Sequence, residues 1–316
     1  MIIRLLMGVK LLSKMLKTTC YDETTKIHLS QLYGKRICVD TSIYLYRYKG
    51  QGMLIENFYL MCTLFKHYNI IPIFVFDGKP PKSKDKEIEN RKEERENAYV
   101  EYDILKEKYG DNITKEQQDE LNNLKKKMVY IGKKDVDIIK NLLDGYGMKY
   151  ITATGEADIL CASLVLKKRV FAVLTEDMDM FAYTCPYILR YFSLRNHSCI
   201  QYNLKKILTK LEISKENFQL VCVLSGNDYY NSTKNIFYYM KLYNKFKKIK
   251  SGNFFEWLIL NDYIIGEDLD DIQNILNMYT NGPKSELSQY KYFNIKYGSV
   301  NNSVMKSILE TDRFIF

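Results

Sequence analysis

The stretch VFAVLTEDMDMFAY, residues 170–183, joins an apolar run directly to three carboxylates. The five apolar residues 170–174 predict a short strand that is buried on both faces. Glu176, Asp177 and Asp179 follow at once, so the predicted strand ends in negative charge. The chain as a whole is basic, with a net charge of +9, which makes this acidic strand end a candidate for a specific role.

Composition and charge indicate a globular protein with a negatively charged partner. A chain of 316 residues that is 46% hydrophobic is long and apolar enough for one large globular domain or two small ones. The positive net charge favours a polyanionic partner, and nucleic acid ahead of a membrane. The N-terminal apolar run is interrupted by Arg4, Lys10 and Lys14, so no transmembrane span or cleaved leader is predicted. We expect an intracellular protein, in the nucleus or at a cytoplasmic replication site, and not a secreted one.

Cysteine and histidine provide no evident metal site. The seven cysteines occur singly without a CxxC pair, and the three histidines lie far apart in the sequence. Zinc and dithiol redox motifs are therefore not predicted. Any metal site must consist of carboxylates, which suits a hard cation such as Mg²⁺.

The order of apolar runs predicts an α/β fold. Short runs at 36–39, 70–76, 149–151, 170–174 and 189–192 are separated mostly by helical patterns. This alternation is typical of βαβ units, and it predicts a mainly parallel central sheet flanked by helices. A charged insertion at 79–135 is predicted to be either a solvated helical hairpin or a mobile element over the sheet edge.

Acids follow the predicted strands, at the sheet edge where α/β proteins bind ligands. Each one alone has an ordinary explanation as a helix cap, a turn residue or a partner of a helix dipole. Carboxylates brought together from several strand ends would repel each other unless cations bound there. Two divalent ions about 3.5–4 Å apart, which clamp a phosphate and activate water, are the chemistry that such a set predicts. The acids are Asp40, Asp77, Glu156, Asp158, Asp177, Asp179 and, after a predicted helix at 220–224, Asp228.

Two sets of basic residues complement these acids. Lys84 and Arg91 begin the insertion seven residues apart, so on a helix they share a face that could lie over the metals. The segment 229–255 contains lysines and no acid. An apolar stripe predicts an amphipathic helix there, with Ile236, Met240, Tyr243 and Ile249 on its buried face. Its lysines suit sequence-independent contacts with DNA phosphates, although an ordinary basic helix would have the same pattern. Those with helical spacing are Lys234, Lys241, Lys245 and Lys248.

The order of these motifs resembles the flap endonuclease (XPG) family of structure-specific 5′ nucleases. The similar segments are MGVKLLSKML at 7–16, VDTSIYLY at 39–46, VFDGKPP at 75–81, GEADILCASLV at 155–165, TEDMDMF at 175–181 and LSGNDYY at 224–230. The resemblance implies a PIN-like nuclease core over about residues 7 to 250. It also implies a helical arch, formed by 79–135, through which a 5′ single strand passes.

The resemblance further implies roles for individual residues. The first four of the seven acids would serve mainly one metal, and Asp177, Asp179 and Asp228 the other. Lys84 and Arg91 would contact the scissile phosphate. Tyr46 would stack on the base beside the cut, and we assign its neighbour Arg47 to DNA binding as well.

The chain departs from the family pattern at several places. Six residues precede Met7, where the family usually begins, so Met7 is an alternative start. Asp158 stands where Glu is more usual. The residues at 234–237 read KNIF instead of a glycine hairpin, which removes the glycines of the family's monovalent-ion site. No sliding-clamp box of the QxxLxxFF kind is found in the sequence, so no clamp partner is predicted.

These observations predict a monomeric nuclease that uses two Mg²⁺ ions, with Mn²⁺ as a substitute, to cut DNA at 5′ flaps or branches during replication or repair. Its predicted segments are an N-terminal nuclease segment (7–135), an internal nuclease segment (136–228) and a helical duplex-binding region (229–316). A 5′→3′ exonuclease of the same family is the alternative. A Holliday-junction resolvase and a non-catalytic DNA-binding scaffold are less favoured.

Overall fold

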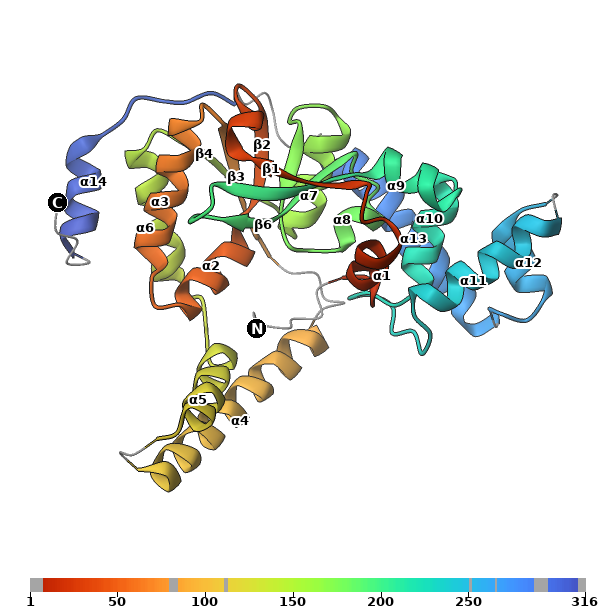
Figure 1. Ribbon diagram of the computed structural model, residues 1–316, viewed down its shortest axis with the longest axis horizontal. Coiled ribbons are helices and arrows are strands. Elements are labelled where there is room, and N and C mark those ends of the chain that lie inside the picture. The colour runs from red at the N-terminus through yellow and green to blue at the C-terminus, as the bar shows by residue number, and fades with distance from the viewer. Residues whose placement is uncertain are drawn as a thin grey trace.

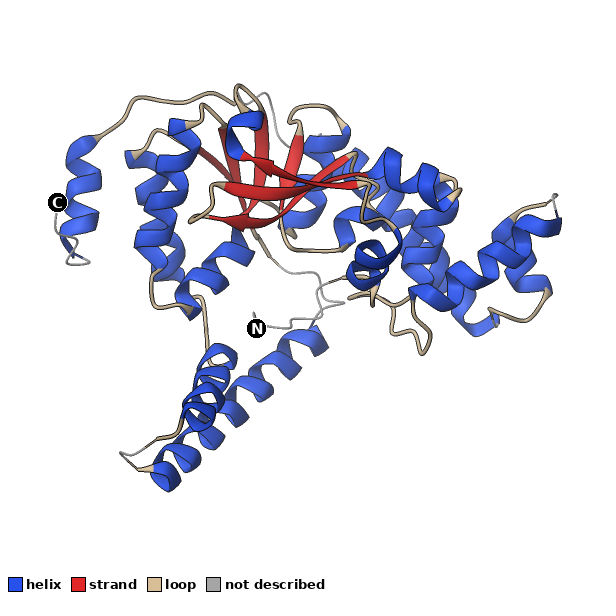
Figure 2. Ribbon diagram, in the orientation of Figure 1, coloured by secondary structure: helices blue, strands red, loops and turns tan. Residues whose placement is uncertain are grey.

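A computed structural model describes residues 8–79, 85–110, 113–249, 252–264, 266–286 and 295–311. Its centre is a seven-stranded sheet with the order β1-β7-β6-β5-β2-β3-β4 (Figures 1 and 2). The strands are β1 (Thr24–His28), β2 (Arg36–Asp40), β3 (Ile71–Phe76), β4 (Lys149–Thr152), β5 (Ala172–Leu174), β6 (Tyr187–Ser193) and β7 (Ser198–Asn203).

The pairing of the strands confirms the predicted, mainly parallel sheet. β4, β3, β2, β5 and β6 run parallel to one another, whereas β7 pairs antiparallel with both β6 and β1. All five predicted strands are present, although β5 begins at Ala172 instead of residue 170. Strands β1 and β7 were not predicted. The edge strand β1, TTKIH, is mostly polar, and only Ile27 in it is buried. Strand β7, SCIQYN, lies between β1 and β6 and has no continuous apolar run.

Helices cover both faces of the sheet (Figures 1 and 2). The helices are α1 (Leu12–Thr19), η1 (Leu29–Leu32), α2 (Thr41–Gly50), α3 (Leu54–His67), α4 (Asp85–Tyr109), α5 (Lys115–Lys127), α6 (Lys133–Gly145), α7 (Ala157–Leu166), α8 (Asp179–Ala182), α9 (Leu204–Leu211), α10 (Lys215–Leu224), α11 (Ile236–Phe246), η3 (Lys247–Ile249), α12 (Phe254–Leu260), α13 (Gly266–Glu286) and α14 (Asn302–Thr311). Among the described residues, no helix is long and apolar enough to cross a membrane.

Alternation along each central strand sends its side chains into two separate cores. In β2, Cys38 packs with α1, α7 and α10, whereas Ile37 and Val39 on the other face pack with α2, α3 and α6. In β3, Val75 and Phe76 divide between the two cores in the same way. Because both faces are covered, the central strands are apolar throughout, as the sequence indicated.

The charged insertion is a hairpin of two helices, α4 and α5, that projects away from the sheet (Figure 1). Ala98 on α4 and Leu121 and Leu124 on α5 are buried, and they form the apolar seam of the hairpin. Thr114 caps the start of α5 in a capping box with Gln117. The predicted range, about 79–135, overlaps the start of α6, which begins at Lys133 and belongs to the central body.

The C-terminal helices are divided between different parts of the molecule. In α11, Ile236, Met240 and Tyr243 are buried as the predicted stripe requires. Ile249 is 50% exposed, because α11 ends at Phe246 and the chain continues in η3, which breaks the helical spacing. Further on, α13 packs against α7, and α14 packs against α6.

Candidate active site

Six of the seven predicted acids lie where parallel strands end. Asp40 is the last residue of β2, and Asp77 follows β3. Glu156 and Asp158 begin α7 after β4, and the Asp177/Asp179 pair follows β5. The parallel registers of β4, β3, β2 and β5 align their carboxyl ends, so these acids share one edge of the sheet.

A chain of hydrogen bonds orients the acids at the ends of β2 and β5. The Thr175 hydroxyl donates to Asp40 Oδ2 at 2.8 Å and accepts from the Asp177 backbone N–H at 3.0 Å. The Asp179 N–H then donates to Asp177 Oδ1 at 2.8 Å. Thr175 was not among the predicted site residues, although its place directly after the strand was visible in the sequence.

Asp77 and Glu156 are held from other elements. Asp77 accepts from the Ala157 N–H at 2.8 Å, which uses the first turn of α7, and from the Ser42 hydroxyl at 2.5 Å. Glu156 Oε2 accepts a hydrogen bond from the Tyr229 hydroxyl. Tyr229 adjoins Asp228 on the loop after α10, so this bond connects the loop of the seventh acid to the other six.

The pKa values show that these charges act on each other. Burial, followed by the charge of Asp77, raises the pKa of Asp40 to about 8, although the Thr175 hydrogen bond opposes the rise. Burial and the charges of Asp177 and Asp40 hold the pKa of Asp158 well above its ordinary value. Ionising the whole set is therefore costly unless a cation compensates it.

The donor set fits Mg²⁺ by its chemistry, since it consists of carboxylate oxygens. Within the described part of the chain, no three acidic, histidine or cysteine side chains already form a group that could hold a metal ion. Mg²⁺ is usually bound through one or two carboxylates, several waters and substrate phosphates, and seldom by an all-protein cage. The residues therefore suit an open site that water and substrate complete.

Gly8 lies against two of the acids. With φ at +75°, it adopts a conformation that favours glycine, and a Cβ atom there would lie 2.4 Å from Asp179 Oδ1 and 2.5 Å from Asp177 Oδ1. The N-terminal segment can pass over these carboxylates only because residue 8 has no side chain. Gly8 was not among the predicted site residues, although its place in the family-like opening segment was a usable signal.

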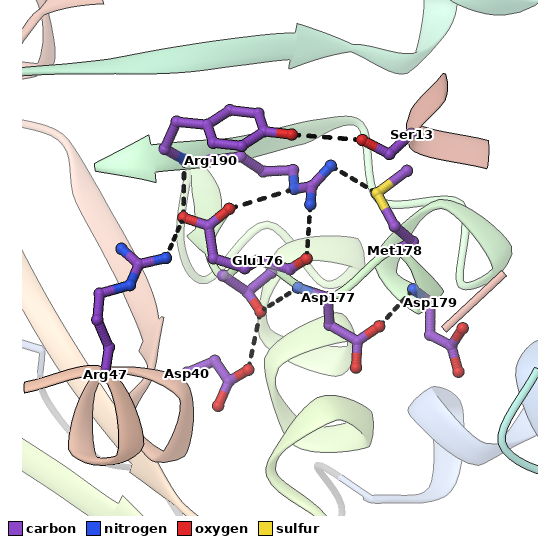
Figure 3. A network of polar contacts seen from close by, with 10 residues as sticks. Ser13, Asp40, Arg47, Glu176, Asp177, Met178, Asp179 and Arg190 are labelled. Atoms are coloured by element: carbon purple, nitrogen blue, oxygen red, sulfur yellow. Dashed lines mark hydrogen bonds and ion pairs between the residues drawn. The ribbon is translucent and has the colours of Figure 1, made fainter. Parts of the chain in front are cut away.

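Glu176 is excluded from the acid cluster by two arginines (Figure 3). Its carboxylate pairs with Arg47 of α2 at 2.9 Å and with Arg190 of β6 at 3.7 Å. Arg190 also donates to the Glu176 carbonyl at 2.7 Å, and the Tyr191 N–H donates to the Glu176 carboxylate at 2.8 Å. The loop that presents Asp177 and Asp179 is thus anchored on its far side. The Arg47 side chain is only 13% exposed and is paired with Glu176, so the predicted contact of Arg47 with DNA would require it to leave this ion pair.

The other predicted contacts lie at the surface. Tyr46 is 37% exposed. Burial raises the pKa of its phenol, and the positive charge of Arg91, near the start of α4, opposes this rise. The charge of Asp77 acts on the same phenol, so Arg91 lies on the same side as this acid. Lys84 lies outside the described residues. The four predicted DNA-binding lysines around α11 are exposed.

Comparison with known proteins identifies the family. Residues 7–98 match the family model of the XPG N-terminal domain, and residues 147–228 match that of the XPG I-region, so the two cover more than half of the chain. The chain belongs to the XPG family. All seven acids of the candidate site fall inside these two regions, whereas most of the α4/α5 hairpin and everything after residue 228 fall outside them.

Individual XPG-family relatives are similar at moderate identity. Flap endonuclease 1 of Meyerozyma guilliermondii is 32% identical over 250 residues, which are 73% of this chain but only 65% of that protein, less than two thirds of its length. Flap endonuclease 1 of Encephalitozoon cuniculi is 29% identical over 98% of this chain and 91% of that protein. The catalytic core of Rad2, solved in complex with a DNA substrate, has a TM-score of 0.66 at 22% identity. That match covers 96% of this chain and 94% of the Rad2 core, and it shows a shared fold.

Proposed function

We propose that this protein is a metal-dependent, structure-specific nuclease that hydrolyses phosphodiester bonds of DNA at 5′ flaps or branches. One observation carries the proposal: carboxylates from the ends of four parallel strands share one edge of the sheet, where burial, followed by the charge of Asp77, raises the pKa of Asp40 to about 8. Such a set is unfavourable without cations, and the cations that it suits are those of phosphodiester hydrolysis. The names of the XPG-family relatives support the same activity.

The site residues would have different roles in this reaction. The seven acids would hold two Mg²⁺ ions, or Mn²⁺ in their place, which when bound supply an activated water and neutralise the phosphate. Arg91, and Lys84 with it, would stabilise the charge that develops on the scissile phosphate. Tyr46 would stack on the neighbouring base, and the lysines around α11 would hold the duplex through its phosphates.

The hairpin bears on the choice of substrate. It projects away from the sheet (Figure 1), and Arg91 near the start of α4 acts by its charge on Tyr46, as Asp77 does. A single strand that passes along the hairpin would therefore lead to the candidate site. This arrangement favours a 5′ flap, while a 5′→3′ exonuclease acting at duplex ends is the second candidate. We propose that the protein works as a monomer inside the cell, in the nucleus or at a cytoplasmic replication site.

Cleavage of a labelled 5′-flap duplex, with and without Mg²⁺, tests the activity. We expect cleavage that requires Mg²⁺ and that Asp177→Asn abolishes. Asp22→Asn, at an exposed position before β1, is the matched control, because it removes one negative charge away from the acid cluster. A nicked and a blunt duplex in parallel separate flap cutting from exonuclease action. The proposal fails if wild type cuts none of these substrates faster than Asp177→Asn does.

A further inference from the structure

We propose that Tyr279, in α13, is a positioning residue that orients Asp179 for metal binding, so that a helix outside both matched family regions completes the active site. The inference rests on the proposed function, because it assumes that Asp179 holds a catalytic metal. It concerns a different part of the chain, since α13 follows the last residue of the I-region match, Asp228.

The contact between the two side chains is direct and buried. The Tyr279 hydroxyl donates to Asp179 Oδ2 at 2.6 Å, while Tyr279 is 1% and Asp179 is 3% exposed. A phenol keeps its proton at neutral pH, so it acts as the donor, and a bond to a charged acceptor away from water is strong. It fixes one carboxylate oxygen, which sets the direction that the other presents to a cation.

Aromatic packing fixes the position of the hydroxyl. The Tyr279 ring lies 4.6 Å from the ring of Tyr183, the C-cap of α8, and 6.3 Å edge-on from the ring of Tyr229. Tyr229 in turn donates to Glu156. Tyr279 thus packs against tyrosines from two other segments, and two of the three tyrosines donate to a carboxylate of the candidate site.

The helix α13 is itself anchored at several points. Thr280 donates to Gln219 at 3.0 Å, and Gln219 donates to the Ala182 carbonyl at 2.7 Å, next to Tyr183. Nearer its end, Ser163 of α7 donates to the Pro283 carbonyl, and Thr154 donates to Glu286 at 3.0 Å. Because α7 also begins with Glu156 and Asp158, α13 holds a fixed position relative to both groups of acids. A loosely attached helix could not orient Asp179 in this way.

Tyr279→Phe tests the role, because it removes the hydroxyl and keeps the ring. Loss of a partner that orients a ligand typically weakens metal binding about 10- to 100-fold. We expect calorimetric titration with Mn²⁺, without DNA, to show about 10-fold weaker binding by Tyr279→Phe than by wild type. Cleavage should then need more Mg²⁺, while the KM for the flap substrate stays unchanged.

A control and a cycle separate positioning from general destabilisation. Tyr146→Phe also removes a buried hydroxyl, which bonds Thr63 at 2.7 Å in the other core, and should leave Mn²⁺ affinity unchanged. In a double-mutant cycle, adding Tyr279→Phe to Asp179→Asn should cause no further loss of affinity. If Tyr279→Phe does not fold, Tyr279→Met, which can fill an irregular space but offers no donor, replaces it.

The outcomes distinguish this inference from the proposed function. A folded variant without the hydroxyl that binds Mn²⁺ as tightly as wild type overturns the role of Tyr279, even if wild type cuts DNA. Equal weakening in Tyr146→Phe overturns it too. A third outcome is that wild type cuts no DNA, while Tyr279→Phe binds Mn²⁺ more weakly than wild type and Tyr146→Phe does not. The positioning role then stands and the nuclease proposal fails.

Discussion

Glu176 has a different role from the two aspartates beside it. Its side chain is 14% exposed and lies between Arg47 and Arg190, whose side chains are 13% and 7% exposed (Figure 3). A buried ion pair contributes little compared with apolar packing, but removing one partner leaves the other charge uncompensated. The two arginines therefore make Glu176 necessary for the structure, and through it they fix the loop that carries Asp177 and Asp179.

Glu176→Gln should destabilise the protein strongly. The change leaves Arg47 and Arg190 without their counter-charge, and loss of one partner of a buried pair costs about 3 kcal/mol. Urea unfolding measures the free energy. The control is Glu212→Gln, which breaks a surface pair with Lys247 where Glu212 is 75% exposed, and which should change stability little. Equal effects of the two substitutions would show that the Glu176 cluster does not anchor the loop.

Single residues also show how far the sequence can predict a site. Asp177 and Asp179 were predicted because an apolar run and the acids that follow it are a local pattern. The partners of Glu176 could not be predicted, because Arg47 lies in α2 and Arg190 in β6, and only the sheet brings them together. Gly8 and Tyr279 were missed for the same reason, since each meets Asp179 across a long sequence separation.

The helix α11 shows what amphipathic spacing can and cannot predict. The buried face with Ile236, Met240 and Tyr243 was predicted correctly, because a face of this kind follows from the 3.6-residue repeat. Ile249 was assigned to that face wrongly, because no repeat indicates that the helix ends at Phe246. The exposed lysines of the opposite face are the residues of this helix that we propose contact DNA.

Substituting the lysines of α11 should weaken DNA binding in a salt-dependent way. Lys241→Gln with Lys245→Gln removes two exposed charges, so the slope of log affinity against log salt should fall by about 2. Fluorescence anisotropy with a flap duplex at several salt concentrations measures the slope. Lys205→Gln with Lys206→Gln, exposed on α9, makes the same change in net charge and should leave the slope nearly unchanged. If both pairs lower it equally, binding depends on net charge and not on α11.

For the whole molecule, the central sheet was more predictable than the packing of the C-terminal helices against it. The alternation of apolar strands with helices predicted the parallel sheet and placed the acids at its edge. Sequence patterns did not show that the chain returns after residue 229 to both sides of this sheet, α13 against α7 and α14 against α6. These contacts depend on shape. The segment around Tyr297 and Gly298 can lie close to the body because Gly147, which faces it, has no side chain. The Tyr297 hydroxyl also donates to the Ile70 carbonyl.

The attachment of the C-terminal segment can be tested at Gly147. The Gly298 N–H donates to the Gly147 carbonyl at 2.6 Å, the Asn301 N–H donates to the Gly145 carbonyl at 2.8 Å, and the Tyr297 hydroxyl donates to the Ile70 carbonyl at 2.5 Å. A Cβ atom on Gly147 would lie 2.6 Å from the carbonyl oxygens of Gly298 and Ser299. Since these are backbone atoms, they can move away only if the segment shifts.

Gly147→Ala should therefore loosen the segment 295–311. Gly52→Ala is the matched control, because Gly52 has a φ of +71° against +67° at Gly147 but has no atom within 4 Å of the added Cβ. Both substitutions incur the strain of a left-handed residue, about 1–2 kcal/mol, and only Gly147→Ala also meets the neighbouring backbone. Hydrogen exchange should become faster in α14 for Gly147→Ala and stay unchanged for Gly52→Ala. Unchanged exchange in both would mean that α14 is held by Ile308 and its other apolar contacts with α6, not by the close approach of the two backbones.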